Sequence, residues 1–280
     1  MSPAGVNAAS AQVVLCDHEI VHHLTYKGDV VMGDVVAKPP EADTPAQSFP
    51  ERLMGIFISP VETLADVARK PDFVAPLIVL ILATVAVTEI LLWKVGLERL
   101  VRMGLEQSNA ASRMSPEQIE QVVHQQVRIG TYTAHLGAVL GVPIVLLILA
   151  GLGILIVNVI FGGRAKFKTI FSEICYADLV TLLASLMAIA LIWFGDPDHF
   201  NQANPIPSNL GYFLNPHEVS KPLYSLASSL DIFTIWFLIL MSIGLAEASG
   251  RKVKPLSVFL VYGGIWVLWI LVKVGWAVIF

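Results

Sequence analysis

Leu136–Phe161 has the sequence LGAVLGVPIVLLILAGLGILIVNVIF and contains no charged residue. A transmembrane helix needs about 20 predominantly apolar residues to cross a hydrocarbon core of about 30 Å. This stretch meets that requirement, and a helix that is apolar all round is not expected on the surface of a soluble domain. It therefore predicts a membrane-spanning helix.

Apolar stretches of similar length recur on both sides of this one. The whole chain of 280 residues is 55% hydrophobic and only 14% charged, with a mean hydropathy of +0.70. Such values lie outside the range of soluble globular domains. We therefore predict an all-α membrane protein with a bundle of five transmembrane helices, of which the other four cover approximately Val74–Val95, Tyr176–Phe194, Leu230–Glu247 and Leu256–Phe280.

The orientation of this bundle follows from the Lys and Arg residues in its short loops, because such loops stay in the cytoplasm. Basic residues lie between the second and third stretches and between the fourth and fifth. The pattern predicts a cytoplasmic N-terminus and an outer C-terminus. With two residues before the first span, these basic residues form a candidate surface for partners or lipid: Arg69, Lys70, Arg164, Lys166, Lys168, Arg251, Lys252 and Lys254.

The N-terminal part of the chain has a different composition. Residues 1–50 contain several prolines among polar residues, which predicts a mostly disordered tail before a membrane domain at residues 51–280. The tail residues Cys16, His18, His22 and His23 include metal-ligand types, but no second ligand pair follows at zinc spacing. We therefore expect no metal site and no cofactor.

Two capping-box sequences predict helix starts outside the apolar stretches. Ser59–Glu62 reads Ser-Pro-Val-Glu and precedes apolar residues at helical spacing, which predicts an amphipathic helix in the membrane surface before the first span. Ser115–Gln118 reads Ser-Pro-Glu-Gln and predicts a helix that lies on the outer side of the bundle.

Ionisable residues inside a bilayer are costly and call for a partner or a function. Counting about 1.5 Å per residue places Glu89 and Lys273 at nearly the same depth, so they form a candidate intramembrane pair. Separate solvation, an ion pair and a proton or ion path all stay open for them. Asn158, Asp178 and Glu247 form a candidate polar cluster near the cytoplasmic side.

Asp178 and Asp231 raise the question of a two-aspartate intramembrane protease, in which paired carboxyl groups activate water. The predicted spans place Asp178 at the cytoplasmic start of one helix and Asp231 at the outer start of the next. On these boundaries the two residues lie on opposite sides of the bilayer. The sequence therefore predicts that they do not form one site.

Several short motifs follow one another along the chain: Phe57–Thr63 before Lys70–Phe73, Phe167–Phe171 leading to Cys175–Ala177, Leu226–Trp236, and Ile243–Leu245. Together these motifs resemble the YIP (Ypt/Rab-GTPase-interacting protein) domain family, especially its bacterial branch. The resemblance covers roughly residues 52–280 and implies five transmembrane helices with a cytoplasmic N-terminus. In a bacterium the location would be the cytoplasmic membrane.

For eukaryotic members, the family implies non-enzymatic work in vesicle trafficking with Rab-type GTPases, but their Asp-Leu-Tyr-Gly-Pro motif is absent from this chain. We therefore expect a non-enzymatic scaffold or adaptor in membrane organisation or trafficking-like processes. Its partners would be the lipid bilayer and membrane proteins or a second copy of the chain. A net charge of -4 argues against nucleic acid. The alternative is a small transporter or channel that uses Glu89 and Lys273.

Overall fold

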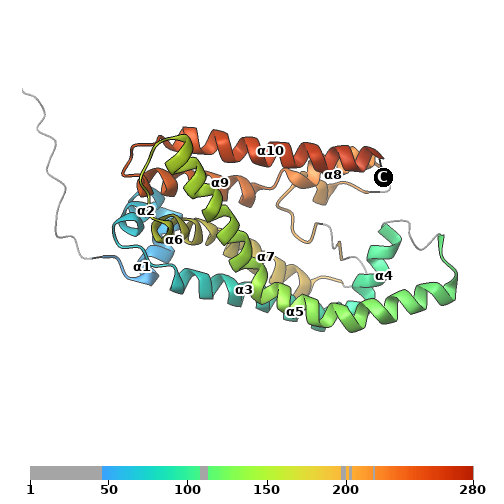
Figure 1. Ribbon diagram of the computed structural model, residues 1–280. Coiled ribbons are helices and arrows are strands. Elements are labelled where there is room, and N and C mark those ends of the chain that lie inside the picture. Colours follow the sequence, from blue (N-terminus) through green and yellow to red (C-terminus); the bar gives the residue numbers. More distant parts are fainter. Residues whose placement is uncertain (1–45, 108–112, 197–199, 202–203, 217, 280) are drawn as a thin grey trace, which may run out of the picture. The chain divides into compact units, whose positions relative to one another are not determined.

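The computed structural model describes residues 46–107, 113–196, 200–201, 204–216 and 218–279. The predicted tail at residues 1–50 and its Cys16 and His residues lie almost entirely outside this range. The described residues belong to one compact unit, Pro45–Phe280. Its elements in chain order (Figure 1) are α1 (Phe49–Ile58), α2 (Pro60–Arg69), α3 (Val74–Lys94), α4 (Leu97–Gln107), α5 (Pro116–Ile154), the π-helix η2 (Leu155–Ile160), α6 (Phe167–Asp178), α7 (Thr181–Phe194), the 3-10 helix η4 (Leu210–Phe213), α8 (Lys221–Ser229), α9 (Ile232–Ala248) and α10 (Pro255–Ile279).

The predicted all-helical class is confirmed for the described residues, which include no β-strand. Within the described part of the chain, four segments are long and apolar enough to cross a membrane: Val74–Lys94, Pro116–Ile160, Phe167–Phe194 and Pro255–Ile279. The protein is therefore an integral, multi-pass membrane protein in contact with the lipid bilayer. Helix α9 is apolar but has only 17 residues, so a fifth span stays a prediction.

The second and third of these segments differ from the predicted boundaries. The Ser115 capping box is confirmed, because Ser115 Oγ accepts from Gln118 N at 3.3 Å and Ser115 N donates to Gln118 Oε1 at 2.8 Å. The helix that it begins is not a separate one, however. Nothing between Pro116 and Ile154 ends it, so the amphipathic part continues directly into the apolar part. The third segment starts at Phe167 rather than at Tyr176.

The helical region begins upstream of the predicted first helix. Ser48 N and Oγ both donate to Glu51 Oε2, at 2.6 and 2.9 Å, at the start of α1. The predicted capping box at Ser59 is wrong, because the Ser59 side chain caps nothing and its carbonyl instead accepts from Thr63 Oγ1 at 3.1 Å. Ser59 is the junction between two helices, so its backbone is already engaged by α1.

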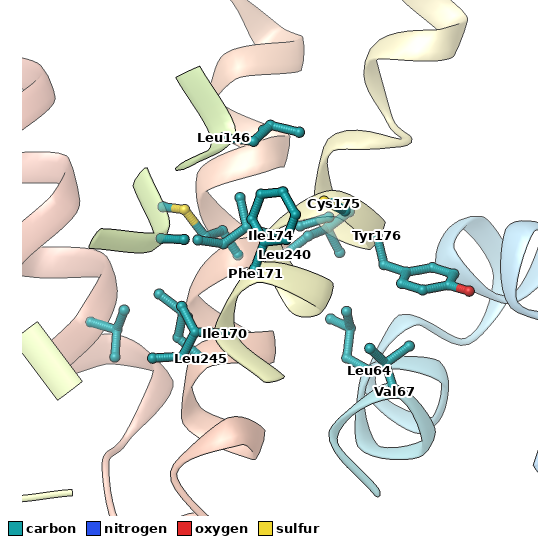
Figure 2. Close-up of a cluster of buried hydrophobic side chains, with 14 of the residues drawn as sticks. Leu64, Val67, Leu146, Ile170, Phe171, Ile174, Cys175, Tyr176, Leu240 and Leu245 are labelled. Carbon is teal, nitrogen blue, oxygen red and sulfur yellow. The ribbon is translucent and has the colours of Figure 1, made fainter. Parts of the chain in front are cut away.

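Helix α6 lies at the centre of the main hydrophobic core and packs against α9, α5 and α2. Figure 2 shows its side chains between those of α9 and α2. The apolar side chains of α2 that point to this core are Leu64 and Val67, both fully buried. Of the α2 face that was predicted to meet the membrane surface, Leu64 therefore packs on protein, whereas Val61 is 47% exposed. Together, α1 and α2 form a cap over α6 and α9, which we call the N-terminal cap.

Candidate functional site

A buried ion pair joins the two helices of the N-terminal cap. Arg52 Nη2 lies 2.8 Å from Asp66 Oδ2, and both side chains are only 3% exposed. Arg52 Nε donates to the same carboxylate oxygen at 2.9 Å. A buried pair is favourable only when its remaining hydrogen-bonding groups are satisfied, and here further partners surround it.

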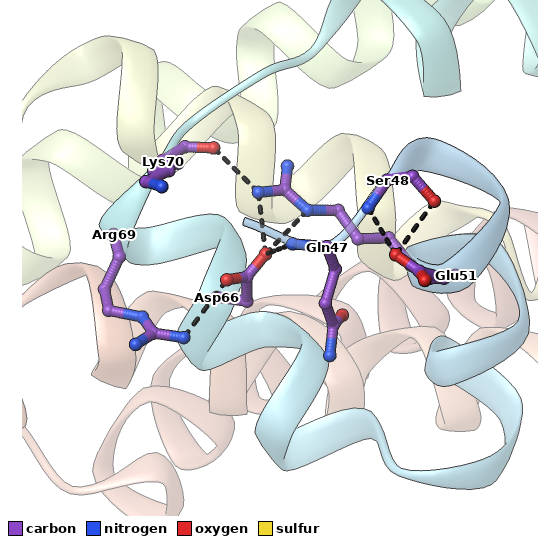
Figure 3. Close-up of polar contacts among 7 residues, drawn as sticks. Gln47, Ser48, Glu51, Asp66, Arg69 and Lys70 are labelled. Carbon is purple, nitrogen blue, oxygen red and sulfur yellow. Dashed lines mark hydrogen bonds and ion pairs between the residues drawn. The ribbon is translucent and has the colours of Figure 1, made fainter. Parts of the chain in front are cut away.

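These partners come from two segments of the chain, the residues just before α1 and the end of α2 (Figure 3). Gln47 N donates to Asp66 Oδ2 at 3.1 Å, and Arg69 Nη2 lies 3.1 Å from Asp66 Oδ1. Arg52 Nη2 also donates to the Lys70 carbonyl oxygen at 3.1 Å, where α2 ends. The ion pair therefore fixes the entry to α1 and the exit from α2.

The Arg52 guanidinium also connects the N-terminal cap to helix α6. The Arg52 Cζ atom lies 5.5 Å from the centre of the Tyr176 ring, a cation–π geometry. The Phe49 ring packs on Tyr176 as well, at 6.3 Å between ring centres. Burial would lower the pKa of Arg52, but its interactions with Tyr176 and Asp66 outweigh burial and raise that pKa, so Arg52 stays charged.

The predicted basic surface surrounds this cap. In Figure 1, the α5–α6 and α9–α10 connections lie at the same end of the unit as α1 and α2. Positive φ angles at Gly162, Gly250 and Arg251 turn the chain sharply in these connections. All eight basic residues of the predicted surface are exposed: Arg69, Lys70, Arg164, Lys166, Lys168, Arg251, Lys252 and Lys254. We call this set the basic end.

Comparison with protein families identifies the domain that carries this arrangement. A family model, described as the Yip1 domain, matches residues 54–277. This chain belongs to the Yip1 domain family. No curated protein and no solved structure gives a significant match.

The Yip1 match confirms the family resemblance read from the motifs. It begins inside α1 and ends inside α10, and therefore includes α2, α6 and α9. Asp66 and Tyr176 lie within the matched region, whereas Arg52 lies just before it. The buried ion pair thus joins the Yip1 domain to the residues that immediately precede it.

The structure gives Glu89 and Lys273, the predicted intramembrane pair, separate partners. Glu89 Oε1 lies 2.8 Å from His135 Nε2, which links α3 to α5. Lys273 Nζ donates to Ser229 Oγ at 3.0 Å, which links α10 to α8. Of the alternatives left open for this pair, the direct ion pair is not among the contacts of the described residues, where each side chain has another partner. A role of either residue in transport stays a prediction.

The predicted polar cluster is likewise divided among different contacts. The Asn158 amide donates to Ala165 O at 2.9 Å and accepts from Ala165 N at 2.8 Å, which closes the loop between η2 and α6. Glu247 binds Arg251 Nε at 2.9 Å within the α9–α10 connection. Both contacts shape the connections of the basic end. Asp178 instead lines cavities inside the bundle.

The predicted separation of Asp178 and Asp231 across the bilayer is wrong. Both line one cavity of about 380 Å³. Asp178 is the last residue of the 12-residue helix α6, so it lies about 17 Å beyond the start of that helix rather than at the start of a span.

Asp231 has a structural task in this cavity. Its Oδ1 accepts from Thr234 N at 2.9 Å as the N-cap of α9, and its Oδ2 accepts from Ser208 Oγ. Both carboxylate oxygens are therefore engaged by neighbouring residues. Shared lining alone does not provide the free pair of carboxyl groups that a two-aspartate protease needs.

Three residues of the core and cap were not anticipated from the sequence. Arg52 and Asp66 are charged residues of short helices, and such residues usually face water. Glu173 is fully buried, and neither of its carboxyl oxygens has a hydrogen-bond partner among the described residues. A Cβ added to Gly244 of α9 would lie 2.6 Å from Glu173 Oε2. Glu173 lies between apolar residues in a segment that was interpreted as a loop. That apolar surrounding is the sequence feature that could have predicted its burial.

Proposed function

We propose that this Yip1-domain protein is a non-enzymatic membrane scaffold or adaptor that binds a partner membrane protein through its basic end. The observation that carries the proposal is the N-terminal cap, which the Arg52–Asp66 pair fixes on α6 and α9 beside the basic loops. A fixed surface loses little conformational entropy when a partner binds. The favoured partner has an acidic cytoplasmic face, because complementary charge speeds and orients association.

The topology in this proposal is five spans with a cytoplasmic N-terminus, in the cytoplasmic membrane of a bacterium. The gathering of the basic loops at one end supports it, because loops rich in Lys and Arg stay in the cytoplasm. Helix α9, with 17 residues, is about 25 Å long and lies at the lower limit for a span. It connects the α8 region to the basic end, so it is proposed as the fifth span.

Labelling of single cysteines tests this topology most directly at the two ends of α9. In a chain with Cys16 and Cys175 replaced by Ala, we expect Phe213→Cys to react with a membrane-impermeant maleimide on intact sphaeroplasts. The side chain of Phe213 is 71% exposed. We expect Lys252→Cys to react only in inside-out vesicles. Labelling of both variants from the same side would contradict a spanning α9.

Partner binding is tested by crosslinking in native membranes followed by mass spectrometry. The variant Arg251→Gln/Lys252→Gln/Lys254→Gln is expected to reduce recovery of the partner roughly tenfold, since three exposed charges contribute about 0.5 kcal/mol each. The control Arg99→Gln/Arg113→Gln/Arg128→Gln removes the same charge outside the basic end and should retain the partner. Equal recovery with both variants would argue against this surface.

A further inference from the structure

A polar pocket of about 470 Å³ opens beside the N-terminal cap, between α1, the connection from α2 to α3, and one side of α6. Its lining includes Arg52 and Tyr176 from the site described above, together with Gln47, Lys70 and Lys168. This volume is within the range of small-molecule sites. The pocket therefore has room for a chemical group well beyond a single water molecule.

Two buried polar atoms in this lining have no hydrogen-bond partner among the described residues. They are the Tyr176 hydroxyl oxygen and Gln47 Oε1. Buried polar groups in native proteins nearly always have a partner, so each such exception needs an explanation. Tyr176 cannot easily turn away, because Arg52 and Phe49 hold its ring. A ligand that accepts the tyrosine hydroxyl proton would satisfy at least one of the two atoms.

The charges around the pocket select an anion. Lys70 and Lys168 are exposed at its mouth, and neither has an ion-pair partner among the described residues. Arg52 is balanced by Asp66. The single acid in the lining, Asp72, accepts from Val74 N at 3.1 Å and so caps the start of α3. Two unpaired lysines and a tyrosine hydroxyl form a donor set suited to phosphate oxygens.

The position of the pocket indicates where such a phosphate comes from. Two membrane segments start beside it, at Val74 and at Phe167. A pocket at the beginning of two spans lies at the level of the lipid headgroups, where basic residues meet anionic lipids. The rings of Phe49 and Pro71 in its wall provide apolar contact beside the polar groups.

We propose that this pocket binds the phosphate group of an anionic phospholipid, with Lys70, Lys168 and the Tyr176 hydroxyl as donors. The lipid would lie against α1, the α2–α3 connection and α6, and would hold the cap and the third membrane segment together. This site shares Lys70 and Lys168 with the basic end, but the α9–α10 connection, which the partner-binding test changes, does not contribute to its lining.

The test measures binding of short-chain phosphatidic acid to the purified full chain in detergent, with phosphatidylcholine of the same chain length and inorganic phosphate as comparison ligands. We expect phosphatidic acid to bind, and inorganic phosphate to compete only weakly because it lacks the apolar part. Lys168→Gln and Tyr176→Phe should each weaken binding roughly tenfold, whereas Lys252→Gln, outside the pocket, should leave it unchanged.

Thermal unfolding of each variant without lipid separates binding from folding. Tyr176→Phe keeps the ring that packs on Arg52 and Phe49, and Lys168→Gln changes an exposed side chain, so both should unfold close to the wild-type temperature. Wild-type affinity in these two variants would overturn the proposal. Equal affinity for phosphatidylcholine, or full displacement by equimolar inorganic phosphate, would overturn the assignment to an anionic lipid.

Discussion

Asp66→Ala is expected to lower the free energy of unfolding by about 3–5 kcal/mol, because it leaves the buried Arg52 guanidinium without its charge partner. The loss would exceed that of an exposed ion pair, since Arg52 cannot reach water without opening the cap. Unfolding followed by circular dichroism in detergent micelles, with increasing denaturing detergent or temperature, measures the effect.

Two matched variants show whether the buried charge is the cause. Glu62→Ala changes an exposed acid on the same helix and should shift the unfolding free energy by less than about 0.5 kcal/mol. Arg52→Met/Asp66→Leu removes both charges with similar volume and should recover most of the loss. If Asp66→Ala were as mild as Glu62→Ala, the buried pair would not hold the cap.

Gly244→Ala is expected to destabilise the fold by about 1–3 kcal/mol through overpacking between α6 and α9. The new methyl group would lie 2.6 Å from Glu173 Oε2 and 3.0 Å from Glu173 Cβ. Glu173 is fully buried, so its carboxyl group cannot move aside into solvent. The same unfolding measurement in micelles detects the loss.

The same substitution in a Glu173→Ala variant tests whether Glu173 causes the loss of stability. Glu173→Ala removes the atoms that the new methyl group would meet, so Gly244→Ala should cost much less in that variant. Gly264→Ala in α10 meets nothing within 4 Å and serves as the control. If Gly244→Ala cost the same free energy of unfolding with and without the Glu173 side chain, the clash with Glu173 would not be the cause of the destabilisation.

The sequence predicted the helical class and the approximate membrane segments because long apolar runs need lipid or a core wherever they lie in the chain. It failed at boundaries where apolar and amphipathic parts share one helix. Ser115 correctly predicted a helix start, yet no residue in the sequence shows that this helix continues through His135 into the membrane. The position of Asp178 was misjudged because α6 includes polar residues before Tyr176 and was interpreted as a loop.

The candidate site was predictable only in part. Six of the eight basic residues follow from a rule about loops, which depends on local composition, and Arg69 and Lys70 were added because they lie just before the first span. The Arg52–Asp66 pair depends instead on how α1 folds back on α2, and the burial of Glu173 depends on α9 reaching α6. Such contacts join residues that are distant along the chain. Local sequence patterns carry no information on such contacts. The burial of these charged residues could therefore not be predicted from the sequence.

The packing of α2 also constrains the order of events during synthesis. The ribosome completes α2 long before α6 and α9, the helices that cover Leu64 and Val67. The apolar face of α2 must therefore wait at the membrane or on a chaperone until α6 and α9 have been synthesised and folded. Docking of the cap is then a late step of biogenesis, and a closed cap marks a chain whose later helices are already in place.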